Sequence, residues 1–171
     1  MRFRLSAALI ALALVLTLPP EAVAQQSPRY GVGLQMLSTT VNDKNNLDVG
    51  PGVRFRVSAP INRDVSLGFG TSFTGFIFGG RDDAKYAFDP QASLIVTLPG
   101  SGEETFYVLG GPGVYLPFGK TDATSGPTFH LGAGKVWLLN ESSFFFEVNP
   151  GLYVGSETTI LLFPLRVGVI F

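Results

Sequence analysis

Hydrophobic and polar residues alternate along most of the chain, and the last segment has the clearest pattern. Between residues 161 and 171 every second position is apolar, while Arg166 and Gly168 are among the residues between them. The apolar positions are Leu161, Phe163, Leu165, Val167, Val169 and Phe171. Successive side chains of a β-strand point to opposite faces of the sheet. The pattern therefore predicts a strand with one apolar face and one face of small and polar residues.

The same alternation predicts eight strands in the whole chain. They cover residues 30–40, 47–59, 65–73, 86–98, 106–118, 129–137, 144–154 and 161–171. Turn-forming residues are concentrated between them, at residues 42–46, 60–63, 79–83, 99–104, 119–127, 140–143 and 155–157. About 11 residues cross a bilayer as a tilted strand, and bacterial outer-membrane barrels have even strand numbers. The sequence therefore predicts an all-β fold, an eight-stranded antiparallel up-and-down transmembrane β-barrel.

Residues 1–24 have the pattern of a secretory signal peptide. A short basic stretch at residues 1–4 precedes an apolar run at residues 5–18, and Ala22-Val23-Ala24 provides a small-residue cleavage site. A membrane anchor is the alternative, but the run is shorter than the roughly 20 residues of a spanning helix. We therefore expect cleavage after Ala24 and a mature barrel domain at residues 25–171. No lipid anchor is expected, because residue 25 is not Cys.

The composition excludes several classes of protein. Only 15% of the residues are charged and 46% are hydrophobic, with 21 Gly, 15 Phe and no Cys. An ordinary soluble domain carries about 25% charged residues, and a chain without Cys has neither disulfides nor a thiolate metal site. The net charge of −1, with scattered Lys and Arg, argues against nucleic acid as a partner. No cofactor is expected.

The two faces of the strands distinguish a membrane barrel from a soluble one. In a soluble barrel, such as a lipocalin, apolar residues line the interior, whereas in a membrane barrel they cover the exterior because hydrocarbon cannot solvate polar groups. Here the apolar face is bulky and continuous, and the other face carries Gly, Ser, Asn and Tyr, which suit the narrow lumen of an eight-stranded barrel. This favours the membrane barrel, and a soluble secreted barrel is the alternative.

Six charged residues lie on the small, polar face. They are Asp48, Asp89, Glu147, Arg54, Arg56 and Arg166. Because buried charges are stable only when paired, the equal numbers of each sign predict a structural network that fills the lumen; an ion pathway is the alternative. With both termini in the periplasm, Arg56, Glu147 and Arg166 fall in the periplasmic third of the barrel. Glu147 and Arg166 are on adjacent strands, so we expect an ion pair between them.

Two features depart from the regular pattern. Lys135 falls on the apolar face of its strand. It either extends to the periplasmic membrane interface beside Trp137, or turns inward towards Glu147 at a bulge near Gly134. Prolines within strands remove a backbone donor, and we expect local bulges or unpaired amides at them.

Several motifs carry a family resemblance. Leu165, Val167, Val169 and the terminal Phe171 resemble the C-terminal signature by which outer-membrane barrels are recognised by their assembly machinery. The chain also resembles the small single-domain outer-membrane barrels of the OmpA/OmpX type in Gly50-Pro51-Gly52-Val53, Gly111-Pro112-Gly113-Val114, Asn149-Pro150-Gly151-Leu152 and Leu131-Gly132-Ala133-Gly134. The resemblance implies an outer-membrane location, contact with outer-membrane lipid and lipopolysaccharide, and assembly by the barrel assembly machinery. The chain departs from the family in its short outer loops, and we expect no peptidoglycan-binding domain after Phe171.

No residue pattern indicates catalysis. Lipid A deacylases among such barrels have a His and a Ser two positions apart facing the bilayer, but the only histidine, His130, is followed by Gly132 and lies on the luminal face. Residues 81–83, Arg-Asp-Asp, are interpreted as a solvated loop and not as a cation site. We therefore expect a monomeric, non-enzymatic protein with a structural or surface-interaction role in the Gram-negative envelope. A narrow channel or small-ligand transporter is the alternative, followed by a lipid A-modifying enzyme.

Overall fold

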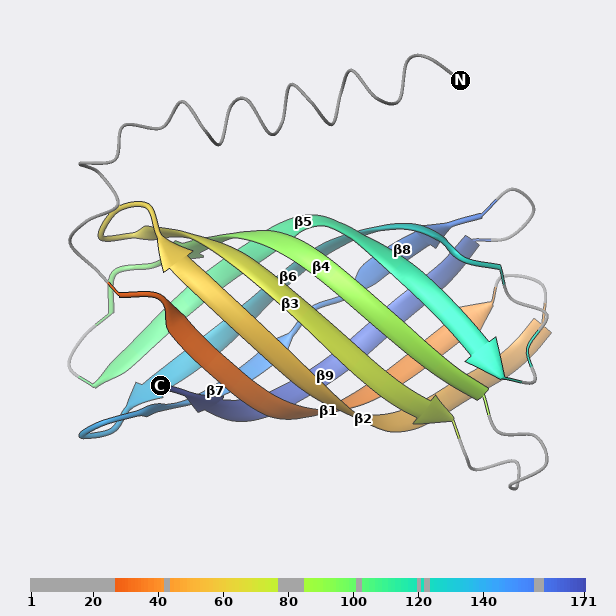
Figure 1. The fold of residues 1–171 in the computed structure, drawn as a ribbon, viewed down its shortest axis with the longest axis horizontal. Helices are drawn as coiled ribbons and strands as arrows, with labels where there is room; N and C mark the ends of the chain where they lie inside the picture. Colours follow the sequence, from red (N-terminus) through yellow and green to blue (C-terminus); the bar gives the residue numbers. More distant parts are fainter. Residues whose placement is uncertain are drawn as a thin grey trace, which may run out of the picture.

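The computed structural model describes residues 27–41, 44–76, 85–100, 103–119, 121, 124–155 and 159–171. Its strands are β1 (Arg29–Val41), β2 (Lys44–Pro60), β3 (Val65–Phe76), β4 (Lys85–Thr97), β5 (Glu104–Gly119), β6 (Gly126–Leu138), β7 (Ser143–Val148), β8 (Gly151–Val154) and β9 (Thr159–Ile170). They wind around a common axis, and the start of β1 lies at the same end as the C-terminus (Figure 1). The predicted signal peptide and the loop at residues 79–83 lie outside the described residues. Within the described residues, no helix is long and apolar enough to cross a membrane.

Hydrogen bonding closes the sheet on itself. Each strand pairs antiparallel with its neighbours around the barrel, and β1 also pairs with β9. At this seam the N–H of Tyr30 donates to the carbonyl of Phe171 over 3.2 Å, and the N–H of Phe171 donates to Tyr30 over 2.8 Å. Both β7 and β8 lie between β6 and β9, so they are two segments of one barrel strand. The structure confirms the predicted eight-stranded antiparallel barrel.

The prolines affect the strands differently from the prediction of bulges. The interruption between β7 and β8 falls at Asn149 and Pro150, yet the pairing register is the same on both sides of it. Flanking backbone contacts bridge the gap, since Leu131 donates to the carbonyl of Pro150 and Asn149 donates to that of Pro164. At Pro51 and Pro112 the register continues without a shift. Of the two expected outcomes at a proline, a bulge is therefore absent at Pro51 and Pro112, because the neighbouring residues keep the strand in register, and an unpaired amide stays a prediction.

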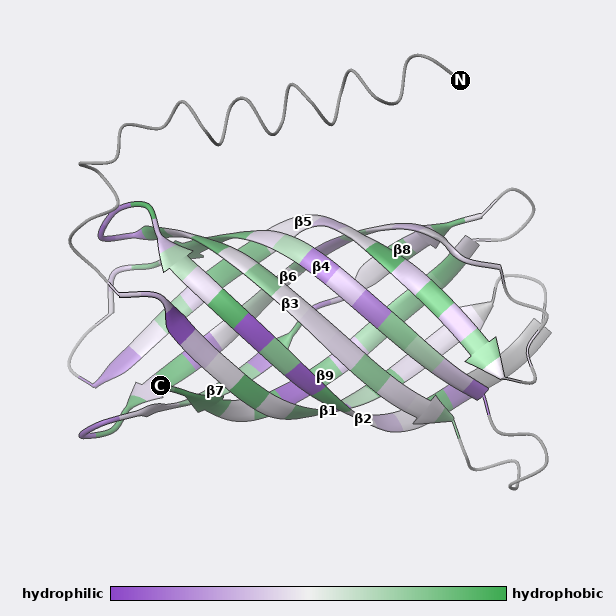
Figure 2. Ribbon diagram, in the orientation of Figure 1, coloured by the Kyte–Doolittle hydropathy of each residue, from purple (hydrophilic) through white to green (hydrophobic). Residues whose placement is uncertain are grey.

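The outer and inner faces of the barrel have opposite chemistry. On β9, Leu161 is 48% exposed, whereas Arg166 is 1% exposed. The same alternation of apolar and polar residues runs along the other strands (Figure 2). The large exposed side chains of β1 and β2 include Tyr30, Val32, Leu34, Met36, Val53, Phe55 and Val57. Because such an exterior matches hydrocarbon and not water, the barrel is a transmembrane one, as predicted.

The interior also contains an apolar layer that the sequence pattern did not predict. It lies towards the end of the barrel opposite the termini, where β3 ends and β4 begins. Its residues are Leu37, Phe76, Ala87, Tyr115, Tyr153, Ile160 and Leu162. The rings of Tyr115 and Tyr153 pack edge to face, with centroids 5.8 Å apart. We call these seven residues the apolar layer; together with the polar residues described next, they fill the lumen at two levels.

Candidate functional site

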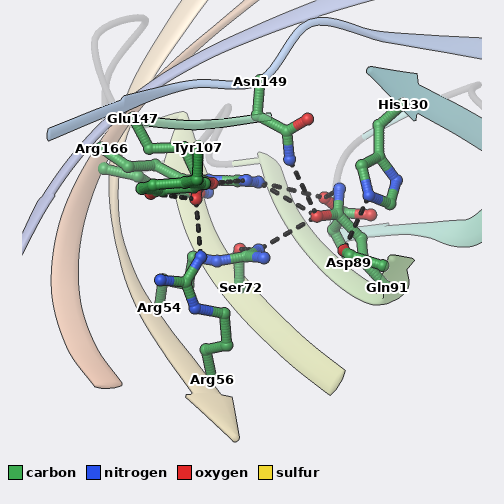
Figure 3. A network of polar contacts seen from close by, with 12 residues as sticks. Arg54, Arg56, Ser72, Asp89, Gln91, Tyr107, His130, Glu147, Asn149 and Arg166 are labelled. Atoms are coloured by element: carbon green, nitrogen blue, oxygen red, sulfur yellow. Dashed lines mark hydrogen bonds and ion pairs between the residues drawn. The ribbon is translucent and has the colours of Figure 1, made fainter. Parts of the chain in front are cut away.

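Glu147 is the centre of a buried polar cluster in the lumen. Glu147 is 0% exposed, and the register of β7 and β9 places Arg166 directly opposite it. Arg166 Nη1 donates to Glu147 Oε1 over 2.8 Å, so the predicted ion pair is present. The other carboxylate oxygen accepts from Arg56 Nη1 at 2.7 Å and from the Tyr107 hydroxyl at 2.9 Å. Three donors from three different strands thus converge on one carboxylate (Figure 3).

Gln91 on β4 joins this carboxylate to the rest of the cluster. Its Oε1 accepts from Arg54 Nη1 at 3.1 Å and from Arg166 Nη2 at 3.4 Å. Its Nε2 donates to Asp89 Oδ2 over 2.8 Å, and the amide of Asn149 also reaches its Oε1, at 3.4 Å. A neutral amide that both accepts and donates can link guanidiniums to a carboxylate. Gln91 therefore connects Arg54, Arg166 and Asp89 across the lumen.

Further neutral side chains complete the cluster. Arg54 Nη1 donates to Ser72 Oγ over 3.1 Å. Arg166 Nε donates to Gln35 Oε1 over 3.1 Å, and Gln35 Nε2 donates to Thr74 Oγ1 over 2.6 Å. We define the luminal network as the buried residues linked in this way, namely Gln35, Arg54, Arg56, Ser72, Thr74, Asp89, Gln91, Tyr107, Glu147, Asn149 and Arg166.

Small residues on the luminal face make room for these long side chains. A Cβ at Gly134 would collide with the ring of Tyr107, and one at Gly70 would lie 2.8 Å from Arg54 Nη2. The guanidinium of Arg56 lies over the Tyr107 ring at 5.6 Å and over the Phe145 ring at 5.2 Å. Such cation–π contacts stabilise a desolvated guanidinium. The abundance of glycine on this face is therefore a requirement of packing in a narrow lumen.

Asp48 does not join the luminal network, although the sequence pattern placed it there. It has the same inward direction along β2 as Arg54 and Arg56, but it lies nearer the end of the barrel opposite the termini. There its carboxylate accepts from Lys85 Nζ over 3.2 Å, and the two side chains are 44% and 40% exposed. The direction of a side chain alone does not fix its height along the barrel axis. Among the described residues, the luminal network therefore has three guanidiniums and two carboxylates, so its charges are not balanced.

Buried His130 forms a hydrogen bond whose partner the sequence did not predict. Its Nε2 lies 2.9 Å from Ser93 Oγ on β4, and both residues point into the lumen. A Ser–His contact is the arrangement by which a base activates a nucleophile, but the base is then oriented by a third group. His130 Nδ1 has no hydrogen-bond partner among the described residues. Since His130 is 1% exposed, neither lipid nor soluble substrate reaches the pair in this conformation.

No group of three His, Cys, Asp or Glu side chains able to hold a metal ion occurs in the described part of the chain. The Arg-Asp-Asp segment at residues 81–83, interpreted above as a solvated loop, lies outside that part.

Lys135 points outward, so the inward alternative is wrong. The register between β5 and β6 is regular around it, without the bulge that would turn it towards Glu147. Lys135 Nζ lies 2.7 Å from Glu104 Oε2, 4.9 Å from the ring centre of Trp137 and 5.2 Å from that of Phe106. The ammonium is thus held by aromatic rings and a carboxylate at the end of the barrel that carries the termini.

Sequence reasoning identified all five charged members of the luminal network and wrongly added Asp48, but it missed the neutral members. The missed residues include Gln35, Gln91, Tyr107 and Asn149. All four occupy inward positions of their strands, and each is larger or more polar than the Gly and Ser residues around it. This difference in size and polarity was the sequence signal that could have identified them. Their partners could not be predicted, because most of the contacts cross the lumen between strands that are not neighbours.

Comparison with known proteins places the fold. No protein-family model and no curated protein sequence matches the chain. Among solved structures, Neisserial surface protein A matches with a TM-score of 0.72 at 10% identity, over 84% of this chain and 95% of that one. Ail, the attachment invasion locus protein of Yersinia pestis, matches with a TM-score of 0.58 at 16% identity, over 84% and 97%. The chain has the fold of a small outer-membrane β-barrel.

A third structure of this kind is the N-terminal β-barrel domain of Pseudomonas aeruginosa OprF, with a TM-score of 0.51 at 15% identity, over 82% of this chain and 97% of that domain. At identities this low the likeness concerns the fold alone. It confirms the architecture implied by the glycine–proline motifs and by the alternation that ends at Phe171.

Proposed function

We propose that this protein is a structural, non-conducting barrel of the Gram-negative outer membrane, which contributes to envelope integrity and surface interactions. The observation that carries the proposal is the filled lumen. The luminal network crosses it at one level and the apolar layer crosses it at another. A chain that uses both levels to pack its interior gains stability and leaves little room for a solute path.

The surroundings of the barrel follow from its exterior. An apolar outer face contacts outer-membrane lipid and lipopolysaccharide, and the C-terminal residues Leu165, Val167, Val169 and Phe171 are the signature that we expect the barrel assembly machinery to bind. Ail, the attachment invasion locus protein of Yersinia pestis, supports surface interaction as a role compatible with this fold. Retention in outer membranes after a high-salt and carbonate wash tests the location; release into the wash would contradict it.

The proposed role is not catalytic. The Ser93–His130 contact is buried inside the barrel, whereas an enzyme acting on lipid A needs its nucleophile and base where the lipid can reach them. Incubation of the purified protein with lipopolysaccharide, followed by mass spectrometry of lipid A, tests this directly. We expect unchanged lipid A, and the loss of an acyl chain would overturn the proposal.

Conductance of the purified protein in planar bilayers tests the filled lumen. Heat-modifiable gel mobility verifies that the purified barrel is folded, and we expect no stepwise current. A variant with Tyr115→Ala and Tyr153→Ala thins the apolar layer but leaves the luminal network intact, so we expect it to remain closed as well. Discrete current steps from the unmodified protein would contradict the proposal and favour the narrow channel.

A further inference from the structure

A cavity opens into the lumen at the end of the barrel that carries the termini. Its volume is about 270 Å³, and its walls come from the start of β1, the end of β9 and the strand ends between them. The polar groups around it include Arg29, Arg56, Arg63, Ser58, Thr105 and Ser143. We call this cavity the terminal vestibule. The terminal vestibule is distinct from the luminal network, although Arg56 and Tyr107 line the one and belong to the other.

The terminal vestibule is surrounded by positive charge. Three arginines line it, and none of the described lining residues is Asp or Glu. Of these arginines, Arg56 is paired with Glu147, but Arg29 and Arg63 are exposed at the rim. The acidic residues at this end of the barrel are exposed and do not line the cavity; they are Asp64, Glu103, Glu104 and Glu141. Glu104 is held by Lys135 on the outer wall. Guanidiniums in a partly enclosed cavity concentrate anions, because the low-dielectric walls focus their field.

The luminal network beneath the cavity adds to this field. Among the described residues, only two carboxylates, those of Glu147 and Asp89, compensate the luminal network's positive charge. Its three guanidiniums belong to Arg54, Arg56 and Arg166. Arg54 Nη2 is also buried without a hydrogen-bond partner in that part of the chain. A surplus guanidinium in the barrel interior is unfavourable unless an anion compensates for it. Arg56 and Tyr107 are the members of the luminal network that line the terminal vestibule, and the surplus positive charge behind them adds to the attraction of the rim for a negatively charged ligand.

We propose that the terminal vestibule binds a phosphate group, free or carried by a small molecule, with Arg29 and Arg63 as its rim contacts. Guanidiniums bind oxyanions through paired N–H donors, and the surrounding Ser and Thr hydroxyls supply donors for the remaining phosphate oxygens. The volume lies just below the roughly 300–1,000 Å³ of ordinary ligand pockets. It suits inorganic phosphate, a phosphorylated small solute or a lipid headgroup, and excludes a polymer.

Phosphate titration of the full-length barrel in phosphatidylcholine nanodiscs tests the site, with amide NMR shifts of Ser58, Thr105 and Ser143 as the readout. We expect saturable shifts with inorganic phosphate and none with chloride at equal ionic strength. The double variant R29Q/R63Q removes two charge-assisted contacts, so its affinity should fall about tenfold or more. A second set of nanodiscs containing phosphatidylglycerol distinguishes the sources, since binding of an anionic headgroup would shift these amides relative to the phosphatidylcholine nanodiscs before phosphate is added.

The matched control is Lys85→Gln, which removes one positive charge at the opposite end of the barrel, and it is compared with Arg63→Gln. We expect Lys85→Gln to bind phosphate like the unmodified protein and Arg63→Gln to bind it more weakly. Both changes concern partly or fully exposed side chains, and heat-modifiable mobility verifies that each variant is folded. The proposal is overturned if phosphate gives no saturable shift, if chloride gives the same shift, or if the two variants lose affinity equally.

Discussion

Glu147 and Arg166 face each other across β7 and β9, and their 2.8 Å ion pair is shielded from solvent on all sides. The pair is part of a larger arrangement, because Arg56 and Tyr107 bind the same carboxylate. A buried ion pair contributes little net stability compared with apolar packing, but losing one partner leaves an uncompensated charge. Substitutions that leave such a charge behind should therefore have large effects.

Replacing Glu147 with Gln should strongly destabilise the barrel. Arg56 would lose its carboxylate, and Arg166 would keep only the longer 4.0 Å contact with Asp89. We therefore expect the free energy of unfolding to fall by about 3–5 kcal/mol. Urea titration of the refolded protein in lipid vesicles measures this. The control is Glu104→Gln, which removes a carboxylate from an exposed ion pair with Lys135 and should change the unfolding free energy much less. Equal midpoints for Glu147→Gln and the unmodified protein would show that the pair is not stabilising.

The hydroxyl and the ring of Tyr107 should each contribute separately to the free energy of unfolding. Tyr107→Phe removes only the donor to Glu147, and hydrogen bonds to charged groups contribute about 1.5–3 kcal/mol. Tyr107→Leu also removes the ring beneath Arg56, so it should cost about 1–2 kcal/mol more, the magnitude of a desolvated cation–π contact. The same unfolding titration gives both values. If the Tyr107→Phe variant is as stable as the unmodified protein, the hydroxyl does not contribute to the stability of the luminal network.

Trp137 should lie at the membrane interface, close to the lipid headgroups. It is near the end of β6, beside Lys135 and with its ring 5.6 Å from that of Phe144. Aromatic residues of such barrels gather at both interfaces, and the chain has one Trp, so its fluorescence reports this position alone. Lipids brominated near the headgroup should quench the emission more than lipids brominated near the acyl-chain end. The reverse order would place this ring near the bilayer centre.

The sequence predicted the direction of side chains well because a strand has a strict period of two. Outward Leu161 and inward Arg166 follow from their positions, and the Glu147–Arg166 pair follows from the adjacency of their strands. Counting from the strand ends gave an expected height for Arg56, Glu147 and Arg166, but the membership of Asp48 in the network was predicted from direction alone, without its height along the barrel axis. Asp48 pairs with Lys85 instead of joining the luminal network.

The apolar layer shows a second limit of the sequence pattern. Residues 160–163 are all apolar, so no polar residue marks the inward positions there, and the direction of these side chains follows only from the period of the rest of the strand. The structure places Ile160 and Leu162 inside and Leu161 and Phe163 outside. Inward apolar residues pack against Tyr115 and Tyr153 from other strands, and these partners are remote in sequence. The neutral members of the luminal network were missed for the same reason.

Spin-label accessibility along β9 tests most directly whether the barrel has an apolar exterior in contact with lipid and a filled interior. The chain has no Cys, so single cysteines at residues 160–167 can each be labelled without background in the vesicle-reconstituted protein. We predict that collision with oxygen, which concentrates in the bilayer, is high at positions 161, 163, 165 and 167 and low at 160, 162, 164 and 166. Reversal of this alternation, or equal oxygen accessibility at all eight positions, would contradict the transmembrane barrel described above.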